Sequence, residues 1–498
     1  MQKNKARIAA IAVLLTATVA LAALELFFPA FLAANRRLRA ASSQEAGTIN
    51  IYVAGESTAV GVPYDSELSF SRILAWMYGG RLGPDRINII NLAQQGSGLE
   101  AQYWALLKEL SLRPPRKGLL LVYAGINETG VEEDTGAVAR WRLAQGSVLL
   151  SKLLFLAEGE ELEPVFGPRS TPAKFEYRLR RLVSLAASHG LRTVISTLSG
   201  NFSGLPPYRS GEVPAGPVYA AALRSEAAGR WKEAADLYAG LLVVSHGQPE
   251  LHYRLGVCLA KRGRAREAAA HFLRVADYGQ QKRPTSIQND TIRRVAASQG
   301  ARLVETAELF ERASPGGLVG YNLFLDAHHP NLAGYLLLAG SFSAGVSELT
   351  GIKPRRSAPT EREMLAAFPF SDDELFEVHA SRVKWFCANS TMSTAPEQLI
   401  RKAEEHAAAA EALAGRLGKS RGLELKVCFL KLLISAARRD TGGVRFWLER
   451  GDFLGRNSGF IKAGNADYDS WVRGMLVYSG LPEALYLDLP AGSGAPPG

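Results

Sequence analysis

Apolar and polar residues alternate along most of the chain with two different periods. Short runs rich in aliphatic and β-branched residues predict strands, and the longer stretches between them, apolar at every third or fourth position, predict helices. The predicted strands are residues 48–54, 87–92, 119–124, 192–198 and 301–305. Amphipathic stretches at residues 68–79, 99–111 and 173–189 stand between them. Because strands that alternate with helices form parallel sheets, we predict an α/β fold with helices covering a parallel sheet.

A long apolar run opens the chain. Residues 8–34 carry one charge, Glu25. The run exceeds the about 20 residues that span a bilayer, so we predict an N-terminal transmembrane anchor within residues 1–40. A cleaved signal peptide is the alternative, because Ala22-Ala23-Leu24 offers small residues, but the apolar run resumes after them. Basic residues flank the run on both sides, so the orientation of the anchor stays open.

Two similar units stand between the fourth and fifth predicted strands. Ala234 and Ala268 lie 34 residues apart, and so do Tyr238 and Phe272. A period of about 34 residues is typical of tetratricopeptide (TPR) repeats, in which a small residue lets two helices approach. We predict a TPR-like helical insertion over residues 217–279, and a plain helical hairpin with similar Ala-rich faces is the alternative. Two repeats are few for a free-standing array, so the pair would need its host domain or a protein partner.

The chain beyond residue 350 is predicted to be helical. Three helices are expected there, at residues 396–417, 423–439 and 444–450. They belong to a helical C-terminal region over residues 351–489, which carries no motif with a recognisable chemistry. Pro, Gly and Ser dominate the tail 490–498, which we expect to be disordered. The length of 498 residues accommodates these parts beside an interrupted α/β domain over residues 48–350.

Composition narrows the classes of partner. A formal net charge of +10 is moderately basic and is compatible with an anionic membrane surface or with ordinary solubility. The sequence has no zinc-finger spacing, no RNA-binding aromatic pattern and no phosphate loop followed by Lys-Ser/Thr, so we expect no nucleic-acid partner. Cys258, Cys387 and Cys428 are too few and too scattered for a disulfide framework or a metal knuckle, and we expect buried thiols.

Ser57 follows the first predicted strand directly, in the stretch Gly55-Glu56-Ser57-Thr58. Chemistry in α/β proteins lies at the carboxyl ends of the strands, so a serine in this place is a candidate nucleophile. A serine that caps the next helix is the alternative, and the sequence around Ser57 does not decide between the two. A nucleophile needs a base, a group that orients the base, and donors for an oxyanion.

The run Asp326-Ala327-His328-His329-Pro330 offers the base and its orienting carboxylate. It follows the last predicted strand and precedes an apolar helix over residues 332–339, so it can stand at the same sheet edge as Ser57. A helix start with Pro near its first position is one alternative. A metal site from Asp326, His328 and His329 is another, but no other cluster of ligand spacing completes it, so we expect no metal and no cofactor.

Two loops after predicted strands offer oxyanion donors. The first runs from Asn91 to Gly98 and contains Gly96, and the second runs from Tyr123 to Glu128 and contains Gly125 and Asn127. A glycine allows a backbone N–H to approach an oxyanion closely, and an asparagine side chain adds a neutral donor. Either loop alone is a weak signal, because such turns are common after strands.

Taken together, these four blocks resemble the SGNH hydrolases, also called GDSL-type esterases and lipases. Gly55-Glu56-Ser57 is similar to the first block of that family, Gly96 to the second, Gly125-Ile126-Asn127 to the third and Asp326 to Pro330 to the fourth. The resemblance covers residues 48–205 and 284–348, with the repeat pair inside it as an insertion. It implies a three-layer α/β/α, flavodoxin-like sheet.

The resemblance also implies a role for each residue. Ser57 would be the nucleophile, His329 the base and Asp326 its orienting partner, while the backbone N–H groups of Ser57 and Gly96 and the side chain of Asn127 would form the oxyanion hole. One departure is Glu56, where the family usually has Asp. Another is His328, which offers a second spacing from Asp326, although Pro330 favours His329. The α/β-hydrolase architecture fits worse, because Ser57 lacks the second Gly of Gly-x-Ser-x-Gly.

We therefore expect a membrane-anchored serine esterase that hydrolyses carboxylic esters, among them O-acyl groups on a glycan or lipid, with its catalytic domain on the extracytoplasmic side of the membrane. An O-acyltransferase that acts on an extracytoplasmic polysaccharide is one alternative, since the same residues would serve it. The other is a TPR-containing interaction scaffold with a vestigial hydrolase fold, which would bind a protein partner through Trp231, Tyr238 or the groove between the repeats.

Overall fold

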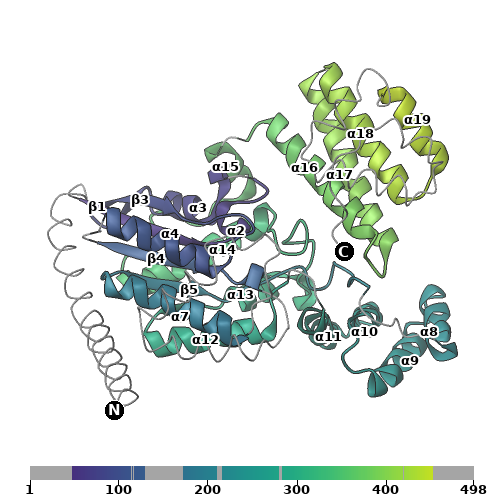
Figure 1. The fold of residues 1–498 in the computed structure, drawn as a ribbon, viewed down its shortest axis with the longest axis horizontal. Coiled ribbons are helices and arrows are strands. Elements are labelled where there is room, and N and C mark those ends of the chain that lie inside the picture. The colour runs from purple at the N-terminus through teal and green to yellow at the C-terminus, as the bar shows by residue number, and fades with distance from the viewer. Residues whose placement is uncertain are drawn as a thin grey trace, which may run out of the picture.

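The computed structural model describes residues 47–64, 66–113, 115, 117–128, 172–209, 216–279, 283–368, 370–418 and 420–452. The predicted N-terminal anchor and the predicted disordered tail lie outside the described residues, as does the C-terminal region after residue 452. The described part divides into a sheet covered by helices, a group of four helices inserted into it, and a helical C-terminal region (Figure 1).

A six-stranded sheet forms the centre of the α/β part. Its strands are β1 (Thr48–Gly55), β2 (Arg81–Leu82), β3 (Asp85–Asn91), β4 (Gly118–Tyr123), β5 (Arg192–Ser196) and β6 (Arg302–Val304). They lie in the order β2-β3-β1-β4-β5-β6, and all neighbours are parallel except β2 and β3. The five predicted strands and the α/β class are confirmed. A wholly parallel sheet is wrong, because the two-residue edge strand β2, too short for a periodic signal, pairs antiparallel with β3.

Strand β1 lies between β3 and β4, and this placement organises the site. All eight residues of β1 are buried, as expected of a parallel strand with both faces covered. In register, Gly55 at the end of β1 faces Tyr123 of β4, and Val53 faces Asn91 of β3. The loops that follow β3 and β4 therefore start on either side of the residue after β1. Without β2, the strand order is that of the flavodoxin-like doubly wound sheets.

Helices cover both faces of the sheet (Figure 1). The helices are α3 (Phe70–Met77), α4 (Leu99–Leu112), α7 (Pro172–Ser188), α12 (Ser286–Gln299), α13 (Thr306–Ala313) and α14 (Leu332–Thr350). Helix α7 packs between α4 and α12 on one face, and α3 packs on α14 on the other. The rings of Phe70 of α3 and Phe342 of α14 are stacked, with their centroids 4.6 Å apart. Short helical turns are α2 (Ser57–Val60), η1 (Ser66–Leu68), η2 (Ile126–Glu128) and η3 (Pro315–Gly317).

One helix of the described residues, α14, is long and apolar enough to cross a membrane, with a mean hydropathy of 1.3. Half of that stretch is buried inside the protein, where α14 packs on β5, β6 and α3. Helices in the cores of globular domains can have this length and composition as well.

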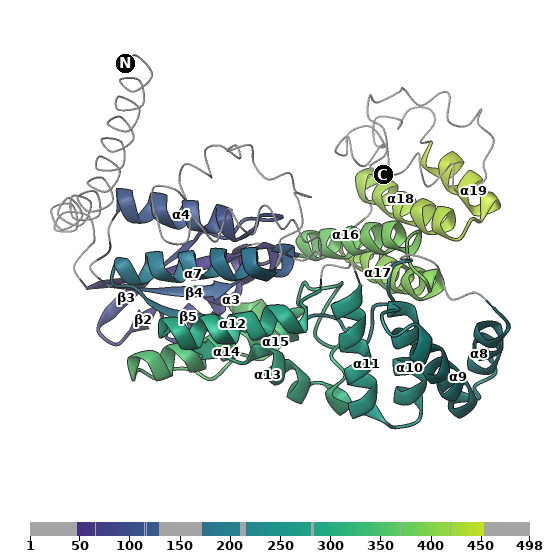
Figure 2. The same ribbon diagram turned by 60° about the horizontal axis from the view of Figure 1, so that its bottom comes forward.

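The segment between β5 and α12 leaves the sheet as four helices (Figure 2). They are α8 (Pro217–Ala227), α9 (Trp231–Val244), α10 (Pro249–Lys261) and α11 (Ala265–Tyr278), and each packs on the next. Ala234, Ala268, Tyr238 and Phe272, which carry the 34-residue offset, are all buried in one apolar cluster. These helices agree with the predicted helical insertion, while its assignment to the TPR repeats stays a prediction.

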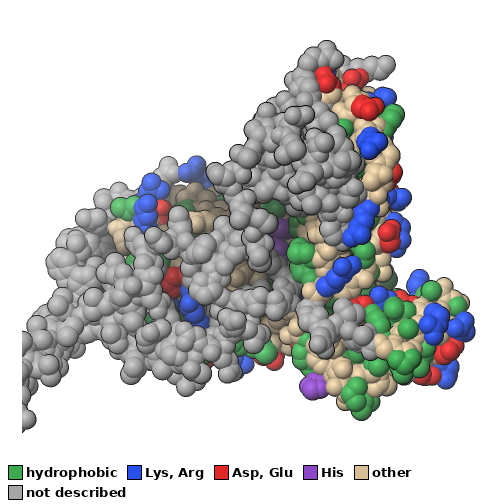
Figure 3. Space-filling model, turned by 45° about the vertical axis from the view of Figure 1, so that its right-hand side comes forward, with side chains coloured by type: hydrophobic (Ala, Val, Ile, Leu, Met, Phe, Trp, Pro, Cys, Tyr) green, Lys and Arg blue, Asp and Glu red, His purple; other side chains and the backbone are tan. Residues whose placement is uncertain are grey.

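The C-terminal region of the described residues is helical and is joined to the α/β part, because Met364 and Phe368 lie in the apolar core of that part. Its helices are α15 (Glu361–Ala367), α16 (Asp372–Ser390), α17 (Pro396–Leu417), α18 (Arg421–Ala437) and α19 (Thr441–Gly451). Positive and negative side chains are mixed along the exposed side of these helices (Figure 3). The region packs on both other parts: the Tyr253 hydroxyl of α10 donates to Gln398 at 2.8 Å, and Leu205 and Ala327 from the α/β part lie in the same apolar cluster as α16 to α18.

The three cysteines are free and buried, as predicted.

Candidate active site

Ser57 stands at the carboxyl end of β1, as the first residue of the short helix α2. The turn requires Gly55, because a Cβ there would lie 2.5 Å from the peptide oxygen of Tyr123 and 2.4 Å from the Cβ of Ala59. Glu56 is the N-cap residue of α2, and no side chain caps this helix. The hydroxyl of Ser57 is therefore not used as a helix cap, which was the alternative interpretation of this residue.

The structure brings Ser57, His329 and Asp326 into one hydrogen-bonded chain. Ser57 Oγ lies 2.8 Å from His329 Nε2, and His329 Nδ1 lies 2.7 Å from Asp326 Oδ2. A carboxylate can only accept, so Nδ1 carries the proton that faces Asp326, and the lone pair of Nε2 faces the serine hydroxyl. Asp326 is 1% exposed, and the side chain of His329 is 14% exposed.

The loop that carries Asp326 and His329 closes on itself as a tight hairpin. The N–H of Leu325 donates to the peptide oxygen of His329 at 2.9 Å, and the N–H of Asn331 donates to Leu323 at 3.0 Å. Asp326 Oδ1 accepts the backbone N–H groups of His328 and His329 at 3.0 and 2.9 Å. The carboxylate thus orients the peptide of the base as well as its ring.

This loop reaches Ser57 across the edge of the sheet. The sequence predicted that this loop follows the last strand directly. In the structure, α13 and η3 stand between β6 and the loop. The N–H of Asn201, after β5, donates to the peptide oxygen of Ala327 at 2.9 Å, and the hydroxyl of Thr58 donates to that of His328 at 3.3 Å. Helix α14 begins only at Leu332 and is capped by Asn331, so Asp326 does not serve as its cap.

The two loops predicted to supply oxyanion donors are joined to each other and to the nucleophile turn. The side-chain nitrogen of Asn127 donates to the peptide oxygen of Ser97 at 3.0 Å, and the N–H of Gln94 donates to that of Gly55 at 3.3 Å. Gly96 has a φ of +73°, in the left-handed region that favours glycine. Gly96 and Asn127 therefore lie in loops that flank Ser57, one after β3 and one after β4.

Glu56, the departure from the family pattern, holds the loop after β4. Its carboxyl oxygens accept the N–H groups of Gly125 at 3.0 Å and Asn127 at 3.1 Å. The pKa of Glu56 is raised from 4.5 to about 8, first by burial and then by the nearby charge of Glu128, while the backbone N–H groups oppose the shift. Glu56 is 2% exposed, so at neutral pH this carboxyl is mostly protonated.

A buried ion pair between Glu128 and Arg178 lies next to the same loops. Glu128 accepts the first N–H of α4, that of Leu99, at 2.7 Å and pairs with Arg178 of α7 at 2.9 Å. Glu100 pairs with Arg181 at 2.9 Å. Glu128 thereby links the loop after β4 to the start of α4, where the loop after β3 ends, and to α7.

The histidine ring that faces Ser57 is that of His329 and not that of His328. The ring of His328 packs beside that of His329, with the centroids 4.1 Å apart. Asp326, His328 and His329 are the one group of the described residues whose ligand atoms lie close enough to hold a metal ion. However, both ring nitrogens of His329 already face Ser57 and Asp326, so a metal there would have to displace the bonds of the serine arrangement.

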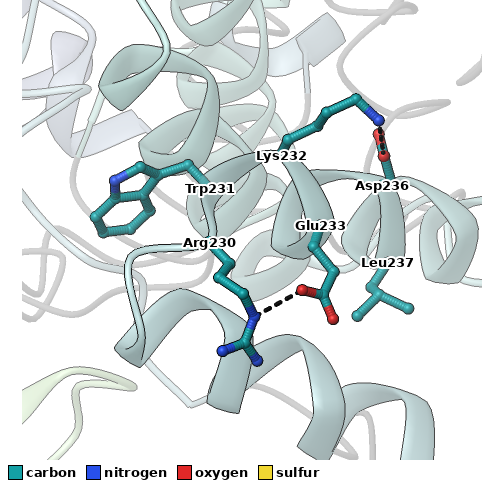
Figure 4. A pocket seen from close by; sticks show the side chains of 6 residues that line it. All are labelled: Arg230, Trp231, Lys232, Glu233, Asp236 and Leu237. Atoms are coloured by element: carbon teal, nitrogen blue, oxygen red, sulfur yellow. Dashed lines mark hydrogen bonds and ion pairs between the residues drawn. The ribbon is translucent and has the colours of Figure 1, made fainter.

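The predicted partner site on the inserted helices lies at a shallow surface hollow. This hollow, at the start of α9, is lined by Arg230, Trp231, Lys232, Glu233, Asp236 and Leu237 (Figure 4). Two exposed ion pairs, Arg230–Glu233 and Lys232–Asp236, cross it. Tyr238, the other residue proposed for partner binding, is fully buried and donates to Glu226 at 2.6 Å. Partner binding through the repeat pair stays a prediction.

Sequence reasoning missed one residue at the site. Arg382, in α16 of the C-terminal region, donates to Asp326 Oδ2 and is itself buried, with 9% of its side chain exposed. No motif surrounds it, and it stands 56 residues after Asp326. Only the packing of α16 against the loop of Asp326 places it there.

The described residues thus define an α/β protein with a Ser–His–Asp arrangement at the carboxyl edge of its sheet. No family model matches the chain, and no curated protein matches it. Among solved structures, it is similar to LAE5, an alpha/beta hydrolase enzyme from the metagenome of Lake Arreo, with 16% identity and a TM-score of 0.31 over 62% of this chain and 98% of that one.

Two further solved structures are similar to this chain at comparable identities and TM-scores. A lipase/acylhydrolase from Enterococcus faecalis has 15% identity and a TM-score of 0.31, covering 62% of this chain and 100% of its own. A GDSL-like lipase from Bacteroides thetaiotaomicron has 10% identity and a TM-score of 0.31, covering 64% and 98%. At these identities and TM-scores the likeness decides neither the fold nor the chemistry of this chain, which follow from its own geometry.

Proposed function

We propose that this protein is a serine esterase that hydrolyses carboxylic esters through Ser57, His329 and Asp326. The observation that carries the proposal is the continuous chain of hydrogen bonds from Ser57 Oγ through His329 to Asp326, at 2.8 and 2.7 Å. These distances are those at which a base takes a proton from its nucleophile. Ser57 is 9% exposed, and the side chain of His329 is 14% exposed.

The first half of the reaction forms an acyl-enzyme. His329 Nε2 takes the proton of Ser57 as Oγ attacks the ester carbonyl, and Asp326 stabilises the imidazolium that results. Collapse of the tetrahedral intermediate breaks the bond to the alcohol, which leaves with the proton from His329. In the second half, water gives a proton to His329 as its oxygen attacks the acyl carbon, and His329 returns that proton to Ser57 Oγ as the bond to the acid breaks.

The oxyanion of both intermediates requires donors beside Ser57. The side-chain nitrogen of Asn127 carries two hydrogens, of which one is donated to the peptide oxygen of Ser97. The second is available for the oxyanion, together with the backbone N–H groups of Ser57 and Gly96. Because the loops are held by Glu56 and Glu128, these donors need no rearrangement when charge develops.

A direct test uses an activity-based label and one variant. A fluorophosphonate should modify Ser57 of the full chain, located by peptide mapping, and hydrolysis of a short-chain nitrophenyl ester should disappear in Ser57→Ala. Ser188→Ala, at the exposed C-terminal end of α7, is the control and should keep the wild-type rate. Labelling of another serine, or a Ser57→Ala variant that keeps the wild-type rate, would show that the assignment is wrong.

A further inference from the structure

Helix α16 of the C-terminal region touches the proposed catalytic triad directly. Arg382 donates to Asp326 Oδ2, the same oxygen that accepts the Nδ1 proton of His329. Asp326 is 1% exposed, so water does not screen this contact. The acid of the triad therefore has a cationic partner from a part of the chain outside the α/β domain.

The same helix contributes to the apolar cluster that contains Ala327, the residue after Asp326. Ala327 is 4% exposed and belongs to the apolar cluster of Ala380, Val383 and Phe386, which are all residues of α16. On its other side, the peptide oxygen of Ala327 accepts the N–H of Asn201. The loop is thus held between the edge of the sheet and α16, and Arg382 is the polar part of that contact.

The charge of Arg382 bears on the chemistry as well as on the packing. Asp326 accepts four hydrogen bonds, two from backbone N–H groups, one from His329 and one from Arg382. A guanidinium is charged at any pH at which proteins fold. It keeps Asp326 ionised, and it opposes a second positive charge on the imidazole that shares Oδ2.

We propose that Arg382 is a positioning residue for the esterase reaction, and that the C-terminal helical region completes the active site by holding Asp326 and His329 through it. This inference rests on the proposed function. It assigns to residues 372–390 a role that extends the triad to a fourth side chain. Arg382 touches neither the substrate nor the reacting atoms, and acts through Asp326.

Several titratable groups surround this arrangement. His328 lies in the same loop, Glu56 precedes Ser57 in β1's turn, and Arg382 acts electrostatically on Tyr64 and on His406 of α17. Burial lowers the pKa of His406 to about 3, so His406 stays neutral over the range in which enzymes are assayed. Burial raises the pKa of Tyr64, which also stays neutral. Arg382 is therefore the cation of this group whose removal changes the field at His329.

The test compares Arg382→Met, Arg382→Lys and a control in the full chain. Arg416→Met is the control. It removes the ion pair between Arg416 of α17 and Asp372 of α16, and Asp372 lies about 15 Å along α16 from Arg382. Two readouts are taken as a function of pH: ester hydrolysis, and the NMR titration of the His329 ring in histidine-labelled protein. The His329 signal is assigned by its loss in His329→Gln.

In Arg382→Met we expect the His329 titration, and the rise of kcat/KM with pH, to move up by about 1 pH unit, because a cation that opposes the imidazolium is gone. At high pH, where His329 is neutral in every variant, kcat should remain lower by at least about tenfold, because the loop is no longer held in place. KM should change little. Arg382→Lys should return the midpoint towards that of the wild type, and Arg416→Met should match the wild type in both readouts.

A merely structural ion pair predicts a different result. It would lower the melting temperature of Arg382→Met but leave the midpoint of His329 and the high-pH kcat of the folded protein unchanged, and this would overturn the inference. If Arg382→Met does not fold, Arg382→Lys decides: it should lose kcat at high pH with the midpoint preserved, and a wild-type kcat would count against the inference. If the wild type hydrolyses no ester, the proposed function is wrong. A shifted midpoint in Arg382→Met would then support only the coupling of Arg382 to His329, and an unshifted midpoint would reject that coupling as well.

Discussion

The carboxyl group of Glu56 accepts the peptide N–H of Asn127 at 3.1 Å. One residue directly precedes the proposed nucleophile and the other carries a proposed oxyanion donor, and 71 residues separate them. This bond joins the turn after β1 to the loop after β4, so the ionisation of one buried carboxyl is expected to affect the whole site.

We predict that Glu56 sets the upper end of the pH range of activity. Its pKa is raised from 4.5 to about 8, so it is neutral at pH 7 and becomes negative as the pH rises through about 8. A negative charge bonded to the oxyanion loop opposes the negative charge of the transition state. Ester hydrolysis by the wild type should therefore fall as the pH rises through this range, whereas Glu56→Gln should show no such decline.

The same shift predicts a dependence of stability on pH. Between pH 4.5 and about 8 the folded protein holds a proton on Glu56 that the unfolded chain releases, so the free energy of unfolding falls as the pH rises through this window. Urea denaturation at several pH values should show that Glu56→Gln lacks this loss. Glu67→Gln, at an exposed carboxylate, is the control. Parallel pH profiles for Glu56→Gln and the wild type would contradict both predictions.

Asn127→Ala should lower kcat by about 10² to 10³, the usual cost of one oxyanion donor, with little change in KM. The side chain of Asn127 also donates to Ser97, so some of the loss would come from the loop itself. Asn88→Ala is a matched control, because Asn88 is exposed on β3 and bonds to Asn50 at 3.0 Å. The measurement is steady-state hydrolysis of a nitrophenyl ester, and equal rates for the two variants would exclude Asn127 as a donor.

Arg178→Met should lower the free energy of unfolding by about 3 to 5 kcal/mol, because it leaves the buried carboxylate of Glu128 without its cation. The side chains of this pair are 4% and 1% exposed. Arg180→Met, two residues along the same helix, removes the more exposed pair with Glu176 and should cost less than about 1 kcal/mol. Urea denaturation compares the two, and similar losses would show that the burial of the Arg178 pair carries no special weight.

Gly256→Ala should destabilise the contact of α10 and α11 by about 1 to 3 kcal/mol, because the added Cβ would lie 2.8 Å from the ring of Phe272. Gly240→Ala tests the same substitution where a Cβ would meet nothing within 4 Å, on the exposed side of α9. That variant should be more stable by up to about 1 kcal/mol, from helix propensity alone. Thermal unfolding measured by circular dichroism distinguishes these opposite signs.

Much of the α/β part follows from local patterns. Buried parallel strands are continuous apolar runs, so β1 and β4 stand out against the polar loops that follow them. The pair Asp326 and His329 is only three residues apart, which confines both to one loop whatever the rest of the fold. By contrast, β2 has two residues and offers no period, and α13, which separates β6 from that loop, was not predicted.

The predicted helices of the C-terminal region were placed well, but their purpose could not be inferred. Residues 396–417 form α17 as predicted, and the next helix begins two residues earlier than expected, at Arg421. Amphipathic periodicity indicates that a helix buries one face, and does not indicate which surface that face meets. The packing of α16 on Ala327 therefore has no counterpart in the sequence pattern.

By itself, the sequence determined the strands, the chemical types in each loop and the residues to examine at the sheet edge, because each depends on neighbours along the chain. Only the tertiary structure decided which of these groups meet. Glu56 binds the loop after β4 because β1 and β4 are adjacent in register, and Arg382 reaches Asp326 because α16 packs on its loop. Contacts between residues far apart in the chain depend on how whole elements pack, and burial at those contacts then sets the pKa and the charge of the groups that meet there.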